Sequence, residues 1–181
     1  MATRWRIMKQ LNGVKNRVRR WLAIYFPEFD SVFLSWEGKA AQACLQKFPT
    51  PSLVLEQGIE GITQHWKEVG LKAVGVKRAT KLYEAAKRSV GISQGLRAAR
   101  EELSLLLEEY SLLKHQEQRI MALVEELLSK IPACRELLKI KGIGLVTAAG
   151  FLSEVGDITR FDSPKQIQKY AGLNLKENSS G

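Results

Sequence analysis

The residues with the clearest chemical meaning lie in one turn near the end of the sequence. Gly142 and Gly144 separate two apolar, helix-forming stretches in the segment LLKIKGIGLVTAAGFLSEVG, residues 137–156. Glycine permits backbone conformations that other residues resist, and it lets another molecule approach the chain closely. A helix that restarts at Gly144 leaves its first amides unpaired, and these amides, at the positive end of the helix dipole, suit a phosphate. Lys139 and Lys141 flank the turn and add positive charge.

The core of this turn, KGIGLVTA, resembles the helix-hairpin-helix motif, in which a hydrophobe, glycine, hydrophobe and glycine precede small residues such as Thr-Ala. Such hairpins bind the DNA backbone without reading its sequence, because phosphate contacts position a protein rather than specify a site. We expect DNA contacts from the turn and from two arginines near the N-terminus: Lys139, Lys141, Gly142, Ile143, Gly144, Leu145, Arg17 and Arg20. A structural helix corner that touches no DNA is the alternative interpretation.

The overall charge agrees with a polyanionic partner. The chain has 28 basic and 19 acidic residues, a net charge of +9 and a pI near 9.7, and such a balance speeds encounter with nucleic acid. No apolar run approaches the roughly 20 residues that cross a bilayer, and the N-terminus lacks the apolar core of a secretory signal, so we expect a cytoplasmic protein with no membrane partner. Cys44 and Cys134 form no zinc-ligand spacing with His65 or His115, which predicts buried free thiols and no metal site.

Helices are expected throughout, and no strand pattern or internal repeat stands out. Residues 3–25 predict a helix with an apolar stripe at three- and four-residue spacing, formed by Leu11, Val14, Val18, Trp21, Leu22 and Tyr25. A second helix is predicted at residues 39–48. Thr50 is expected to cap a helix that begins at Pro51 and ends at Gly58, and Gly70 is expected to end the next helix, which begins at residue 59.

A long helix without glycine or proline is predicted for residues 96–131. Its seam positions alternate by three and four residues, and eight of the nine are apolar: Leu103, Leu106, Tyr110, Leu113, Glu117, Ile120, Val124, Leu127 and Ile131. This pattern indicates a coiled-coil helix, which the sequence allows either to self-associate or to pack within its own chain. Helices at residues 132–140 and 145–155 then form the hairpin, and Ser163, Pro164 and Gln166 predict a capping box for a last short helix.

The C-terminal residues IKGIGLVTAAGFLSEVGDITRFDSPKQIQKYAGL, with SSG at the end, resemble the DEDD-type insertion-sequence transposases of the IS110 family. The upstream segments LNGVKNRVRRWLAIYFPEF, FPTP and KLYEAAKRSVGI are similar to the family's helical region. The resemblance implies an all-α chain with a helical linker at residues 1–95, a coiled-coil helix at residues 96–131 and an incomplete helix-hairpin-helix transposase domain at residues 132–181. It also implies a bacterial, nucleoid-associated protein that acts in DNA transposition by strand cleavage and exchange.

The family's nucleophilic serine lies just before a glycine after the YAGL segment, which makes Ser180 the candidate nucleophile and Ser179 its neighbouring alternative. A serine hydroxyl that attacks a phosphodiester forms a covalent link between protein and DNA. The RuvC-like domain, whose four acidic residues bind Mg²⁺, has no counterpart here, so we expect no cofactor in this chain, truncation at both ends and no activity alone. The resemblance implies DNA and a guide RNA as partners, and self-association through the coiled-coil helix.

Two other functions remain open. The chain could be a non-catalytic helix-hairpin-helix module that only binds DNA. It could also be a helix-hairpin-helix DNA glycosylase, because such enzymes carry a catalytic aspartate about twenty residues after the glycine turn and Asp162 lies near that distance. The segment FDSPKQ, however, favours a helix-capping role for Asp162.

Overall fold

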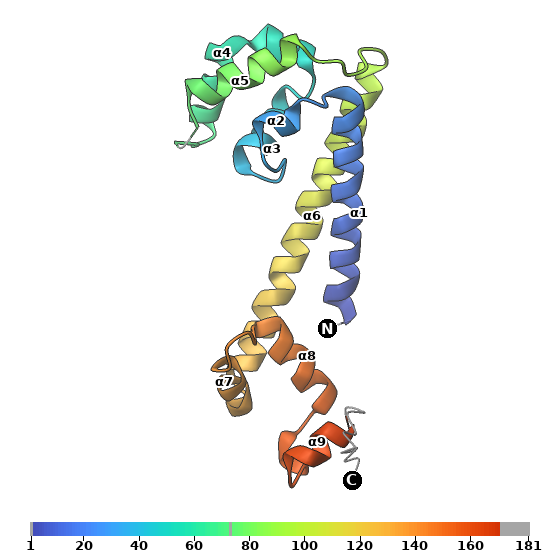
Figure 1. Cartoon of the computed structure of the whole chain (residues 1–181), viewed down its shortest axis with the longest axis vertical. Coiled ribbons are helices and arrows are strands. Elements are labelled where there is room, and N and C mark those ends of the chain that lie inside the picture. The colour runs from blue at the N-terminus through green and yellow to red at the C-terminus, as the bar shows by residue number, and fades with distance from the viewer. Residues whose placement is uncertain (1, 73, 171–181) are drawn as a thin grey trace, which may run out of the picture. The chain divides into compact units, whose positions relative to one another are not determined.

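The computed structural model describes residues 2–72 and 74–170, and every regular element in them is helical (Figure 1). The all-α class predicted from the sequence is therefore confirmed for this part of the chain. The elements are α1 (Ala2–Tyr25), α2 (Phe29–Val32), α3 (Lys39–Lys47), α4 (Pro51–Glu68), α5 (Val76–Lys87), α6 (Leu96–Ser129), α7 (Pro132–Leu138), α8 (Leu145–Val155), the 3-10 turn η1 (Ile158–Arg160) and α9 (Pro164–Tyr170).

The chain divides into two compact units. The N-terminal unit consists of Ile7–His115, and the C-terminal unit consists of Met1–Arg6 with Gln116–Gly181. Each unit has buried apolar side chains of its own, as expected for separately packed cores.

In the N-terminal unit, α1 and the first half of α6 lie side by side and run in opposite directions (Figure 1). The predicted stripe of α1 is buried from Leu11 to Leu22, with Tyr25 half-buried. The indole Nε1 of Trp21 donates a hydrogen bond of 2.7 Å to the carbonyl oxygen of Ala99 on α6. The first four seam residues of α6 are also buried within the chain: Leu103, Leu106, Tyr110 and Leu113.

The remaining helices of this unit pack through aromatic and small side chains. The Phe33 ring contacts the Trp66 ring edge-on at 6.4 Å between centroids, and α5 packs closely along α4. The sequence predicted a helix end at Gly58, and the backbone does leave helical geometry there (φ 67°, ψ 171°) although helical turns continue on both sides. Gly70 has the left-handed conformation expected after a helix end (φ 77°). The Thr50 hydroxyl does not cap α4, because it pairs with the Ser52 hydroxyl at 3.1 Å.

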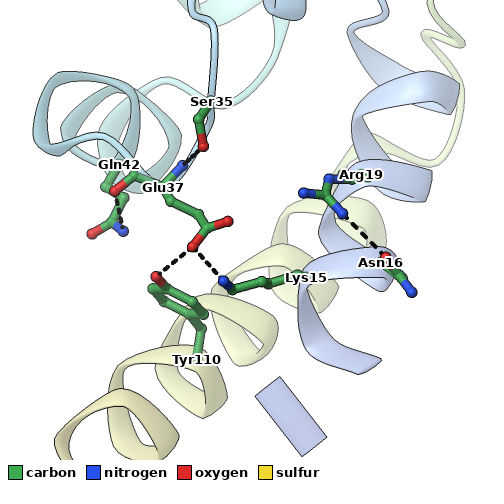
Figure 2. A network of polar contacts seen from close by, with 7 residues as sticks. All are labelled: Lys15, Asn16, Arg19, Ser35, Glu37, Gln42 and Tyr110. Carbon is green, nitrogen blue, oxygen red and sulfur yellow. Dashed lines mark hydrogen bonds and ion pairs between the residues drawn. The ribbon is translucent and has the colours of Figure 1, made fainter. Parts of the chain in front are cut away.

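A polar network connects three segments of the N-terminal unit (Figure 2). The Glu37 carboxylate accepts a hydrogen bond of 3.0 Å from the Tyr110 hydroxyl and forms an ion pair of 2.7 Å with Lys15 Nζ. Burial alone would raise the pKa of Glu37, but the bonds from Lys15 and Tyr110 and the charges of Lys15 and Arg19 outweigh it and lower that pKa. Burial and the bond to Glu37 raise the pKa of Tyr110 to about 12. The network therefore joins α1 and α6 to the loop before α3.

None of the helices in the described ranges, residues 2–72 and 74–170, combines the length and the apolar character that spanning a membrane requires.

Candidate nucleic-acid interface

The predicted hairpin is present in the C-terminal unit, where α7 and α8 are joined by the glycine turn. Pro132 occupies the first position of α7, where its missing amide is tolerated. Gly142 has φ 94°, a conformation that side-chain-bearing residues rarely adopt, while Gly144 is extended (φ −95°, ψ 174°) and precedes the first residue of α8. The amide of Ile143 donates to the carbonyl oxygen of Ile140 at 3.0 Å, which closes the turn.

A small apolar core fixes this turn on the end of α6. Its buried members are Leu128, Cys134, Ala148, Ala149 and Leu152, and Ile143 and Leu145 pack partly against them. Of the predicted seam, Leu127 remains 51% exposed and Ile131 38% exposed, while their neighbour Leu128 faces the core instead. Because Ile143 is the apolar residue between the two glycines, its packing holds the glycines at the surface.

The start of α8 is open to a ligand. The first helical bond runs from the amide of Ala148 to the carbonyl oxygen of Gly144, so the amides of residues 145–147 precede the repeating helical pattern. No side chain of the described residues caps this end of the helix. A Cβ atom built on Gly142 or Gly144 would meet no heavy atom of the described chain within 4 Å. The turn therefore offers amide donors beside unfilled space.

The two lysines of the turn differ in their surroundings. Lys139 Nζ bonds both carboxylate oxygens of Glu136, at 2.7 and 2.9 Å, and both side chains are about 70% exposed. An ion pair so exposed contributes little to stability, so a phosphate can replace the carboxylate at little cost. Lys141 is exposed at the turn itself.

Arg17 and Arg20, the other predicted DNA contacts, lie on α1 in the N-terminal unit. Arg17 forms two hydrogen bonds of 2.8 Å with the Glu109 carboxylate of α6. Its guanidinium therefore already has an anionic partner within the chain. Arg20 is exposed.

Residues after α8 are held by an aromatic cluster. The Arg160 guanidinium lies 4.8 Å from the ring centre of Phe161 and 5.2 Å from that of Tyr170, and the Tyr170 hydroxyl donates to the carbonyl oxygen of Glu154 at 3.3 Å. The side chain of Gln166 bonds Asp162 twice, accepting from its amide at 2.9 Å and donating to its carboxylate at 3.3 Å. The partner of Gln166 is thus Asp162, not the predicted Ser163, and the Asp162 carboxylate pairs with the Gln166 side chain. Ser179 and Ser180 lie outside the described residues.

The cysteines match the sequence-based prediction. Cys44 and Cys134 are both free and buried. Burial raises the pKa of the Cys44 thiol to about 12, so the reactive thiolate is scarce at neutral pH. Within the described residues, no group of three or more His, Cys, Asp or Glu side chains is placed to hold a metal ion.

The C-terminal part of the chain is similar to known proteins. Residues 134–181 match the model of the IS116/IS110/IS902 transposase family. A 42-residue stretch is 45% identical to y4qE of Sinorhizobium fredii, a protein named provisionally as a transposase; it covers 23% of this chain and 11% of that relative. The chain thus spans only a small part of the length of the relative that it matches. No solved structure matches the chain.

The family match begins within α7 and includes the glycine turn, α8 and α9. Through this segment, the chain is similar to the IS116/IS110/IS902 family of transposases.

Proposed function

We propose that this chain is the DNA-binding part of a transposase that acts in DNA transposition, and that the α7–α8 hairpin holds the DNA backbone. One observation carries the proposal: in the segment that matches the family, an uncapped helix start lies beside two glycines with open space over them. A phosphate at this position accepts hydrogen bonds from the first amides of α8 and lies at the positive end of its dipole. Lys141 adds a nearby cation.

Gly144 offers a direct test, because its extended backbone is open to any residue and its surroundings have room for a side chain. We expect Gly144→Val to keep the fold but to fill the space that a phosphate needs, and so to weaken binding to a DNA duplex of any sequence about tenfold or more. Fluorescence anisotropy with labelled duplexes measures the affinity, and far-UV circular dichroism checks the fold.

Gly150→Ala is the matched control. Gly150 also lies on α8, has room for a Cβ atom and is away from the turn, so this variant should bind DNA as the wild type does. Unchanged affinity in Gly144→Val would remove the hairpin from the DNA interface.

We further propose Ser180 as the nucleophile of strand cleavage. Its Oγ would form a bond to phosphorus while the bond from phosphorus to the departing sugar oxygen breaks; the serine proton passes to a base, and the departing oxygen is protonated. We propose that the family's RuvC-like domain binds the Mg²⁺ that stabilises charge in such phosphoryl transfers.

Denaturing electrophoresis tests for the covalent link. After incubation with DNA, Mg²⁺ and the RuvC-like domain, it should show a covalent adduct that Ser180→Ala abolishes and Ser179→Ala retains. Base excision that depends on Asp162 would indicate a glycosylase instead.

The same proposal includes self-association of the chain and a guide RNA as a partner. The second half of α6 supports self-association, because Leu123 and Leu127 are each more than half exposed. Sedimentation of the wild type against a variant with polar residues at both positions tests this part separately from DNA binding.

A further inference from the structure

A second cationic surface lies in the N-terminal unit, on and around α5. Residues 71–100 contain eight basic residues and one acidic residue, Glu84, which gives this sixth of the chain a net charge of +7 out of a total of +9. The eight are Lys72, Lys77, Arg78, Lys81, Lys87, Arg88, Arg97 and Arg100. Such concentration of charge is typical of polyanion-binding surfaces.

The α4–α5 hairpin has the same local design at its turn as α7–α8. In both, an apolar residue and an extended glycine precede the second helix, with Gly75 (φ −135°, ψ −172°) in the place of Gly144. In both, the amide of a fully buried alanine, Ala79 or Ala148, bonds the carbonyl oxygen of that glycine, at 3.2 and 3.0 Å. The sequence showed no internal repeat, because these shared positions are few and their neighbours differ.

The two hairpins differ in the charge of the side chains at the start of the second helix. The two residues after the first position of α8 are Val146 and Thr147, whereas the equivalent residues of α5 are Lys77 and Arg78. Lys81, one turn further on, lines the same hollow as these two cations. The cationic face of α5, defined as Lys77, Arg78 and Lys81, therefore surrounds a depression in the surface of this unit.

The chain itself does little to neutralise this face. Lys77 and Lys81 are exposed and form no ion pair within the described residues, and the first turn of α5 contains no acidic residue. Arg78 lies over the Phe33 ring, 5.8 Å from its centre, so its charge has no carboxylate partner there. Cations near a helix N-terminus oppose the helix dipole, and an anionic ligand would offset this unfavourable arrangement.

The form of the surface favours the backbone of a duplex over a single strand. Single-strand binding uses exposed aromatic rings on which bases stack. On α5 the one aromatic ring is that of Tyr83, which is half-buried, and Lys87 Nζ lies over it at 4.9 Å. Lysine and arginine heads around a shallow hollow instead suit phosphates, which carry the sequence-independent part of nucleic-acid affinity.

We propose that the cationic face of α5 is a second DNA-binding site of this chain, which contacts the phosphate backbone of duplex DNA independently of the glycine turn at Gly144. The choice of DNA as the polyanion rests on the proposed function of the chain, whereas the position of the site rests on the charges of α5 alone.

The test compares two double variants of the full chain that each remove two exposed, unpaired lysine charges from the N-terminal unit. Lys77→Gln/Lys81→Gln changes the proposed site, and Lys39→Gln/Lys67→Gln is the control with the same net charge. The affinity for a labelled DNA duplex is measured by anisotropy over a range of salt concentrations. The slope of log affinity against log salt should become shallower by about two units in the first variant, since each lost phosphate contact removes about 0.9, and should not change in the control.

If the slope changes equally in the two variants, the effect reflects total charge and the proposal is overturned. If the slope changes in neither variant, Lys77 and Lys81 contact no phosphate and the proposal is overturned as well. An effect confined to RNA duplexes or single strands would overturn the assignment to duplex DNA. Gly144→Val in the same assay separates this site from the hairpin. If Lys77→Gln/Lys81→Gln weakens binding and Gly144→Val does not, the α5 site stands and the hairpin proposal fails. If only Gly144→Val weakens binding, the α5 proposal alone is rejected. The thermal midpoint should not fall in Lys77→Gln/Lys81→Gln, because Lys77 lies at the unfavourable end of the helix dipole and neither lysine forms an ion pair within the described residues.

Discussion

At the scale of single residues, Glu37 makes the most specific polar contacts of the N-terminal unit (Figure 2). Its carboxylate joins Lys15 on α1 to Tyr110 on α6, and its side chain is 26% exposed. Its pKa is lowered in the folded state, so the ionised carboxylate stabilises the fold at pH values above the pKa of an unfolded glutamate, about 4.3. That contribution is lost as the pH falls through the lower pKa of the folded state.

We therefore expect Glu37→Gln to lower the free energy of unfolding by about 1–2 kcal/mol at pH 7, the range for a hydrogen-bonded charge that remains partly hydrated. Urea unfolding at a series of pH values measures this difference, which should shrink as the pH falls below about 4. Glu56→Gln is the control, because Glu56 is exposed and its carboxylate forms no hydrogen bond or ion pair with the described residues. A deficit in Glu37→Gln that stays constant over this pH range would show that packing, not charge, explains it.

Sequence could not have identified Glu37 as a connecting residue. Its partner Tyr110 lies 73 positions away, and a lone glutamate before a helix is an ordinary feature of a loop. The glycines of the hairpin could be identified, because their requirement is local: Gly142 needs a positive φ and Gly144 precedes a new helix whatever the rest of the chain does. Local backbone constraints are visible in sequence, whereas contacts between distant segments depend on the fold.

At the scale of elements, apolar periodicity predicted the helices well where one face is buried along its whole length. The stripe of α1 and the first half of the α6 seam are buried as predicted. The prediction of a uniform seam was less successful towards the end of α6, where Leu127 is exposed and Leu128 is buried. The side that a long helix buries is set by what packs against it, and the small hairpin core packs against Leu128.

The start of α5 shows the opposite limit of sequence interpretation. Its basic residues could be interpreted as the solvated side of an amphipathic helix, since lysines are usually exposed. Only the structure shows that Gly75 and Ala79 have the positions that Gly144 and Ala148 have in the other hairpin. A repeated backbone design with few shared side chains is difficult to detect in sequence, because Gly75 and Gly144 have extended backbones that other residues could also adopt.

At the scale of the whole molecule, the two units carry different spectroscopic probes. Three buried tryptophans, Trp21, Trp36 and Trp66, belong to the N-terminal unit, whereas the core beneath the hairpin consists of aliphatic residues and Cys134. Tryptophan emission therefore follows mainly the unfolding of the N-terminal unit, because Trp5 of the other unit is already 68% exposed in the folded chain. Circular dichroism follows the helices of both units.

Leu152→Ala should destabilise the C-terminal unit by about 2–4 kcal/mol, because Leu152 is buried in the hairpin core and its loss leaves a cavity. We expect the circular dichroism transition to begin at lower urea while the tryptophan transition keeps its midpoint, and Leu103→Ala, in the core of the N-terminal unit, to shift the tryptophan transition. A tryptophan midpoint that moves equally in both variants would show that the units unfold together.

If the units do unfold separately, a urea concentration that unfolds only the hairpin should remove the DNA affinity that depends on Gly144. The affinity that depends on Lys77 and Lys81 should remain. The same variant then measures how much of the binding each unit supplies.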